Sequence, residues 1–157
     1  MTKTEQHEAF LARQEEDNKR RKANLEKILK GRIIAFDFDG TITERNEYPK
    51  IGTLRQGMDE CINTLYEHGA EIIIWTCRAL HPENEEVHNT CYLEMLGFLA
   101  HHGIKYHQIN KNTIPLGTNP GPKIYACLYV DDKGLYFNKN CNGASLWCDI
   151  IDHFKKF

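Results

Sequence analysis

The sequence predicts an α/β fold: a doubly wound, Rossmann-like open parallel sheet flanked by helices. Three observations support this fold class. Four-residue apolar runs rich in β-branched or aromatic side chains recur along the chain, as expected of strands buried on both faces. Segments with apolar residues at helical spacing lie between these runs. Strands and helices that alternate in this way form parallel sheets, which bind ligands at the carboxyl ends of their strands.

The first 31 residues differ from the rest of the chain. They hold 8 Lys or Arg and 6 Asp or Glu, and their few large apolar side chains are Phe10, Leu11, Leu25, Ile28 and Leu29. We expect residues 1–31 to form a polar helical arm outside the core, with a solvated basic cluster at 20–22. The α/β core is then expected to span residues 32–157.

Within the core, each element has its own sequence signal. The apolar runs at 33–36, 72–75 and 127–130 predict strands, and a weaker strand is expected at 105–109. Helical spacing predicts a helix across 54–65 and another across 87–99, each followed by a glycine that can end it, Gly69 and Gly103. A last helix is expected at 144–157. Residues 110–122, with two Gly and three Pro, are expected to form a loop.

Length and composition exclude several classes of protein. A chain of 157 residues is expected to form one compact domain with a terminal extension. The formal charge of −2 provides no general basic field, so nucleic acid is not an expected partner. The chain lacks an apolar stretch of about 18 residues and a signal-peptide core, so we expect a cytoplasmic protein that does not bind membranes. Its six cysteines form no C-x-x-C pair, which predicts free and mostly buried thiols.

Polar residues follow the three main strands where each strand ends. Asp37 and Asp39 follow the first strand, Thr76 follows the second, and Asp131 and Asp132 follow the third. Parallel strands end at one edge of a sheet, so these side chains should gather there. Clustered carboxylates repel one another unless a cation offsets them, and Mg²⁺ prefers oxygen ligands. We therefore expect a Mg²⁺ site at this edge.

The order of these motifs resembles a known family. D-F-D-G-T at 37–41, then Thr76, then Lys123, then D-D at 131–132 is similar to the four motifs of the haloacid dehalogenase superfamily of phosphohydrolases, over roughly residues 32–132. The resemblance implies a phosphatase in which Asp37 attacks phosphorus to give an aspartyl-phosphate. It also implies that Asp39 acts as the general acid and base.

The same resemblance implies roles for the other motif residues. The Thr76 hydroxyl and the Cys77 backbone N–H would donate to phosphate oxygens, and Lys123 would neutralise both the phosphate and Asp37. Lys111 lies in the same stretch and is the alternative to Lys123. Three further residues are expected to face phosphate or substrate: Gly40, Thr41 and Arg78.

The metal would bind the Asp37 carboxylate, the Asp39 backbone carbonyl and the pair Asp131 and Asp132. Either member of that pair could be the inner ligand, with the other acting directly or through water.

Members of this superfamily usually carry an inserted cap domain, and the intervals between the motifs are too short for one here. The chain therefore resembles the capless branch. Without a cap, the site is open to macromolecular as well as small phosphorylated substrates, or a second subunit of a homo-oligomer covers it. A flap at 43–52 and the loop at 110–122 are expected to contact substrate. Two alternatives remain: a catalytically silent or regulatory phosphate-binding module, and a nucleic-acid end phosphatase.

Overall fold

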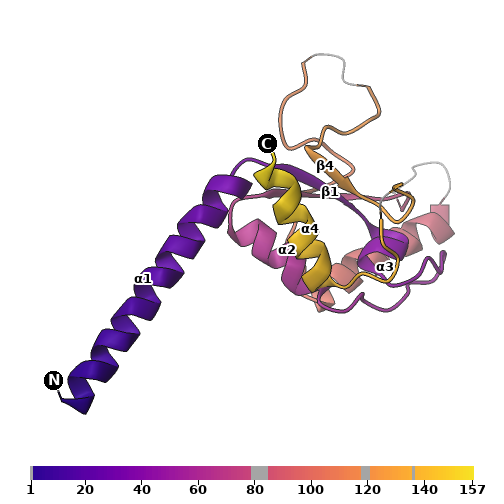
Figure 1. The fold of residues 1–157 in the computed structure, drawn as a ribbon. Helices are drawn as coiled ribbons and strands as arrows, with labels where there is room; N and C mark the ends of the chain where they lie inside the picture. Colours follow the sequence, from indigo (N-terminus) through magenta and orange to yellow (C-terminus); the bar gives the residue numbers. More distant parts are fainter. Residues whose placement is uncertain (1, 79–84, 118–120, 136) are drawn as a thin grey trace.

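A computed structural model of the chain describes residues 2–78, 85–117, 121–135 and 137–157. The fold is α/β, as predicted, with one four-stranded parallel sheet in the order β3-β2-β1-β4 (Figure 1). The strands are β1 (Ile33–Asp37), β2 (Glu71–Trp75), β3 (Gln108–Ile109) and β4 (Leu128–Val130). The helices are α1 (Lys3–Leu29), α2 (Met58–Glu67), α3 (Glu85–His101) and α4 (Gly143–Lys155), and a tight turn, η1 (Phe38–Ile42), follows β1.

The register of the sheet brings the ends of its strands to one edge. The central strand β1 pairs with β2 on one side and with β4 on the other, and Asp37 lies opposite Trp75 while Phe36 lies opposite Val130. The core cluster around β1 is built from buried aliphatic and aromatic side chains of the strands and helices. The residues that directly follow β1, β2 and β4 therefore share one edge, as the sequence predicted.

β3 is shorter than the strand predicted at 105–109. Only Gln108 and Ile109 pair with β2 as a strand. The backbone N–H of Lys105 instead donates to the Asn63 side chain at 2.8 Å, which holds the start of this segment against α2. The last prediction for the core, a helix at 144–157, agrees with α4 to within two residues at each end.

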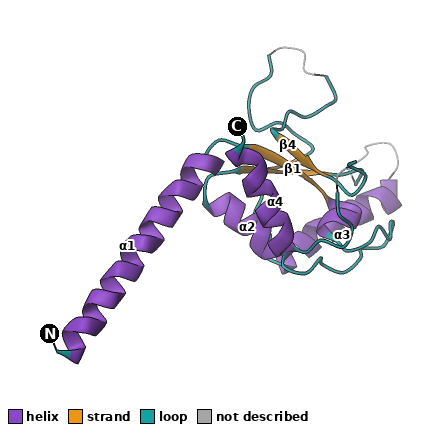
Figure 2. Cartoon of the chain, viewed as in Figure 1, coloured by secondary structure: helices purple, strands orange, loops and turns teal. Residues whose placement is uncertain are grey.

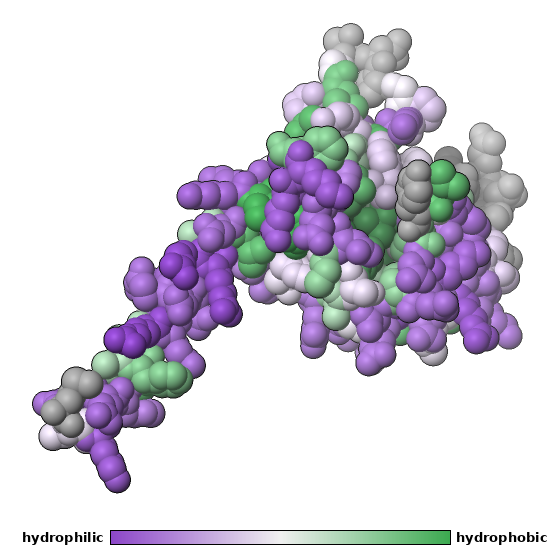
Figure 3. Space-filling model, in the orientation of Figure 1, coloured by the Kyte–Doolittle hydropathy of each residue, from purple (hydrophilic) through white to green (hydrophobic). Residues whose placement is uncertain are grey.

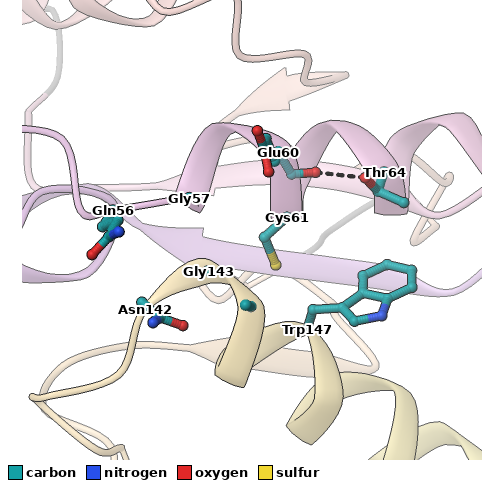
Figure 4. Close-up of a pocket in the computed structure, with 9 residues that line it drawn as sticks. Gln56, Gly57, Glu60, Cys61, Thr64, Asn142, Gly143 and Trp147 are labelled. Carbon is teal, nitrogen blue, oxygen red and sulfur yellow. Dashed lines mark hydrogen bonds between the residues drawn. The ribbon is translucent and has the colours of Figure 1, made fainter.

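Helices α2 and α4 approach each other closely at two glycines (Figure 4). A Cβ atom added at Gly143 would stand 1.8 Å from the Gly57 carbonyl oxygen, so only glycine fits there. The Gly143 N–H donates to the Gln56 carbonyl at 2.7 Å. Beside this contact, the side chains of Cys61 and Trp147 line a hollow between the two helices. None of the residues that follow the strands lines this hollow, so it is separate from the edge described below.

The prediction that residues 1–31 stay outside the core is wrong for the last turn of α1. Leu29 is completely buried in the main core cluster, and Leu25 and Ile28 pack against that cluster. Their spacing of three and four residues places them on one side of the helix, which explains how a mostly polar helix reaches the core. The preceding turns are exposed and project away from the domain (Figures 1 and 2).

All six cysteines are free, as predicted, but only Cys61, Cys91 and Cys141 are buried, whereas Cys77 and Cys148 are exposed. Across the described parts of the chain, no helix combines the length and the apolar character that a membrane span needs.

Candidate active site

Three carboxylates meet at the carboxyl edge of the sheet. Asp37 ends β1, and Asp131 and Asp132 follow β4, the neighbouring strand. One oxygen from each carboxylate lies within 4.8 Å of the other two. The structure thus brings together three of the predicted metal ligands, from positions almost a hundred residues apart in the sequence.

The environment of Asp37 favours its protonated form. Burial, followed by the charge of Asp131 and then by that of Asp132, raises the pKa of the Asp37 carboxyl to about 7. A hydrogen bond from the Thr41 hydroxyl, at 3.2 Å, acts in the opposite direction. A carboxyl with such a pKa is only about half ionised near pH 7, and a cation that joined the cluster would favour its ionised form.

This pKa predicts how stability depends on pH in metal-free protein. The pKa of Asp37 is about 7 in the folded state, against an ordinary value of 3.8. Its contribution to stability is therefore fully present below pH 3.8 and is lost as the pH rises through 7. In EDTA, the melting temperature of the wild type minus that of Asp37→Asn should fall by about 4 °C or more across this window. A difference in melting temperature that stays constant at all pH values would contradict the raised pKa of Asp37.

Thr41 lies in the site, but not as a substrate contact. Its side chain is completely buried. Besides donating to Asp37, its hydroxyl oxygen accepts the Asp132 backbone N–H at 2.8 Å. Thr41 therefore fixes Asp37 relative to the end of β4, and the prediction that it contacts substrate is wrong because no surface of it is open to a ligand.

Gly40 adopts a backbone conformation that favours glycine. Its φ is +87°, and a Cβ atom added there would stand 2.7 Å from the Asp132 carboxylate oxygen. The turn after β1 can therefore pass close to the acidic cluster only without a side chain at this position.

Gly40→Ala is accordingly expected to destabilise the protein. The strained φ alone should cost about 1–3 kcal/mol, and the clash should displace Asp132. Chemical denaturation of the wild type and the variant measures this loss. Gly97→Ala, at a helical glycine with nothing within 4 Å of the added Cβ, is the control and should not destabilise. Equal stabilities of Gly40→Ala and wild type would show that the turn adapts.

Arg78 is buried against Asp39 rather than available to substrate. Its guanidinium donates to both Asp39 carboxylate oxygens, each at 2.7 Å, and the residue is only 1% exposed. The sequence placed Arg78 in an open loop as a substrate contact, and that prediction is wrong. A guanidinium matches a carboxylate in this two-bond geometry, so the pair fixes the Asp39 side chain.

The same guanidinium connects the flap to the site. It donates to the carbonyls of Pro49 at 3.1 Å, Lys50 at 2.7 Å and Cys91 at 3.4 Å. It also lies 5.6 Å from the Phe38 ring centroid and 5.1 Å from that of Tyr48. Arg78 therefore holds four parts of the chain together: η1, the flap, the end of β2 and α3.

Thr76 stands at the end of β2, as predicted, and is held by a residue that sequence reasoning missed. Asn110 donates its amide to the Thr76 carbonyl at 2.8 Å and accepts the Thr76 N–H at 2.9 Å. The Thr76 hydroxyl accepts the Arg78 N–H at 3.0 Å. Cys77 follows in an exposed turn. The positive φ of Asn110, 52°, is common for asparagine at turns, but no sequence pattern marks its partner.

Lys123 does not lie beside Asp37. It is exposed, and its Nζ stands 5.2 Å from the Tyr129 ring centroid. Among the described residues, no cationic side chain is within ion-pair distance of Asp37, so neither Lys123 nor the exposed Lys111 neutralises it here. The cation at the cluster is Lys133, whose Nζ lies 2.5 Å from the Asp132 carboxylate. The sequence signal that could have indicated this role of Lys133 is its position directly after Asp131 and Asp132.

A second buried arginine, Arg55, shapes the turn after β1. It is 4% exposed and donates to six backbone carbonyls, those of Gly40, Thr41, Thr43, Glu44, Lys139 and Cys141, at 2.8–3.5 Å. These bonds attach η1 to the segment before α4. No sequence pattern distinguishes Arg55 from an exposed arginine, because its acceptors come from segments far apart in the chain.

The acidic cluster suits a hard divalent cation. Mg²⁺ binds oxygen at 2.0–2.1 Å, so opposite ligands of one ion stand about 4.2 Å apart. The three carboxylate oxygens lie within 4.8 Å of one another, and at most one pair of them can be opposite, so binding one ion together would bring them closer. All three donors are oxygens, and the pKa of Asp37 is raised first by burial and then by the neighbouring negative charges, which a cation would offset.

Comparisons with known proteins identify the fold but no family. No protein-family model and no curated protein matches the chain. The structure is similar to that of a conserved protein from Bacteroides thetaiotaomicron, with a TM-score of 0.59 and 24% sequence identity. The match covers 81% of this chain and 92% of that one. The two proteins therefore share an α/β fold.

Proposed function

We propose that the protein is a Mg²⁺-dependent phosphomonoesterase of the haloacid dehalogenase type, without a cap domain, in which Asp37 is the nucleophile. The observation that carries this proposal is the cluster of Asp37, Asp131 and Asp132 oxygens within 4.8 Å at the carboxyl edge of the sheet. Asp37 is also the first residue of D-F-D-G-T, and Asp131 and Asp132 form the D-D pair. Geometry and motif order thus agree on the same three residues.

The proposed reaction has two steps. An Asp37 carboxylate oxygen attacks phosphorus, the bond to the leaving oxygen breaks, and an aspartyl-phosphate forms. Water then attacks that phosphorus, the bond to Asp37 breaks, and inorganic phosphate leaves. Bound Mg²⁺, held by Asp37, Asp131, Asp132 and the Asp39 carbonyl, would offset the negative charge of the phosphate and of these carboxylates. Thr41 keeps Asp37 in place throughout through its hydroxyl.

Asp39 can take a proton from the attacking water in the second step. In the arrangement with Arg78, both of its oxygens accept hydrogen bonds, so neither carries a proton to donate. Protonation of a leaving group in the first step would require Asp39 to exchange one of these bonds. The proposal therefore assigns Asp39 the base role directly and makes its acid role depend on movement of the Arg78 side chain.

A second candidate function, a phosphate-binding module without catalytic activity, is favoured by two features of the site. The Arg78 guanidinium binds both carboxylate oxygens of Asp39. The Lys123 Nζ lies over the Tyr129 ring instead of beside Asp37. Both features suit a module that binds a phosphate group and does not hydrolyse it.

Turnover of p-nitrophenyl phosphate, followed by a panel of sugar phosphates, nucleotides and phosphorylated oligonucleotides, separates the two functions. Measurable turnover of any substrate supports the phosphatase. Binding of inorganic phosphate with no turnover of the whole panel supports the silent module instead.

Activity is expected to depend on Mg²⁺. EDTA should abolish turnover, and added Mg²⁺ should restore it, because without the cation the negative charges of the phosphate and the three carboxylates would repel one another. Ca²⁺ should inhibit, since it takes more ligands at longer distances and can engage both Asp37 oxygens. A metal titration of initial rates tests both statements. Full turnover in EDTA would refute a metal site at Asp37.

A further inference from the structure

α1 has few tertiary contacts along most of its length. Its first 22 residues, 3–24, are exposed and project from the domain, and only its last turns reach the core (Figures 1 and 2). Among the described residues of α1, one ion pair forms, between Arg20 and Asp17 at 3.3 Å. Isolated helices gain little stability in water, and most helices in proteins are stabilised by packing. A projecting helix of 27 residues, about 40 Å long, is therefore suited to pairing with another element.

The charge of α1 is divided between its two halves. Residues 3–17 carry five acidic and two basic side chains, whereas residues 18–30 carry six basic and one acidic. The N-terminal half is thus negative and the C-terminal half positive. Two such helices attract each other when they run antiparallel, because each negative half then meets a positive half.

The charges also share one face of the helix. Three glutamates of the negative half and three lysines of the positive half are separated by three, four, seven or eight residues, which places them on a single stripe. All six are exposed: Glu5, Glu8, Glu15, Lys19, Lys22 and Lys30. Glu26, which is half-buried, lies in the same stripe four residues after Lys22, and the buried Leu29, seven residues after Lys22, lies at its border. The stripe is therefore fully open as far as Lys22, and its positive half includes one acidic side chain.

We propose that α1 pairs antiparallel with α1 of a second copy of this chain, the negative half of each stripe lying against the positive half of the other. Such an interface is isologous, with the same surface used by both copies. A parallel pair would instead oppose like charges. The partner is a second copy rather than a nucleic acid, because half of the stripe is acidic and would repel phosphates.

Apolar side chains support the antiparallel direction. Phe10 and Leu11 are 56% and 45% exposed near the free end of α1, where Figure 3 shows an apolar patch on a polar helix. In an antiparallel pair this free end lies near the partner's helix base, where Leu25 and Ile28 are only half-buried. Phe10 and Ile28 lie on the opposite side of the helix from the stripe, but Leu11, three residues after Glu8, and Leu25, three residues after Lys22, border it. Leu11 of each copy then meets Leu25 of the other, and their burial adds to the attraction.

Charge reversal tests the proposal with the full-length chain. One variant replaces Glu5, Glu8 and Glu15 by Lys, and the other replaces Lys19, Lys22 and Lys30 by Glu. Sedimentation equilibrium at low salt should show a reversible dimer for the wild type. Each variant alone should dimerise at least about tenfold more weakly, a loss of about 1.4 kcal/mol. An equimolar mixture of the two variants should form a heterodimer, because opposite charges then face each other again.

High salt should weaken the wild-type dimer, because the charges are exposed and screened. Circular dichroism and the melting temperature of each variant establish that the core remains folded. A wild-type chain that stays monomeric up to about 1 mM overturns the proposal. So does undiminished dimerisation of both variants, or a mixture that stays monomeric. Phosphatase activity is not used as a readout, so this result is independent of the proposed function.

Discussion

Asp37→Asn is expected to reduce phosphatase turnover by several orders of magnitude while the fold persists. The amide has the shape of the carboxyl and can still accept the hydrogen bond from Thr41, but it lacks the charge that attacks phosphorus. Single-turnover assays with p-nitrophenyl phosphate measure the loss. A radiolabelled phosphate ester should also label wild-type protein through the aspartyl-phosphate and should leave the variant unlabelled.

Stability separates a chemical effect of this substitution from an unfolded protein. Because the pKa of Asp37 is raised to about 7, the amide should melt at or above the wild-type temperature at pH 8 without metal. Asp149→Asn removes an exposed carboxylate and is the matched control, expected to keep wild-type turnover. Retention of more than about a tenth of the activity by Asp37→Asn would remove Asp37 as the nucleophile.

The parts of the fold that the sequence predicted are those with local signals. β1 and β2 are continuous apolar runs, and burial on both faces allows few other side chains in such strands. Because parallel strands end together, the positions of Asp37, Asp131 and Asp132 follow from strand assignment alone. Their proximity, confirmed by the structure, needed no knowledge of side-chain packing.

The residues that sequence reasoning misplaced depend on contacts between distant segments. The partners of Arg78 lie 13 to 39 residues away, in η1, the flap and α3. An arginine after a strand end is usually solvated, and nothing local shows that a carboxylate and three carbonyls surround it. Lys123 follows a loop without periodicity, so its direction was not determined by any pattern. Leu29 was assigned to the arm because its neighbours are polar, although one apolar turn is enough to anchor a helix.

Removal of the Arg78 guanidinium is expected to cost the most stability of any substitution considered. Arg78→Met keeps much of the side-chain volume but leaves Asp39, whose side chain is 12% exposed, without its partner. Breaking a buried pair by removing one member costs about 3–5 kcal/mol. The carbonyls of Pro49, Lys50 and Cys91 lose a donor as well. Urea denaturation of wild type and variant measures the change in the free energy of unfolding.

Arg20→Met is the matched control, because Arg20 pairs with Asp17 on the exposed face of α1 with side chains 76% and 59% exposed. Such surface pairs contribute about 0–1 kcal/mol, so the two substitutions should differ severalfold in how much they lower the free energy of unfolding.

The stability of Arg78→Lys should fall between those of wild type and Arg78→Met, because an ammonium retains the charge but cannot make two parallel bonds to Asp39. Combining Arg78→Met with Asp39→Ala should destabilise by less than the sum of the two single changes, since the second substitution removes the unpaired carboxylate. Additive effects in this cycle, or a loss for Arg78→Met no greater than that for Arg20→Met, would show that the guanidinium does not stabilise Asp39 and the flap.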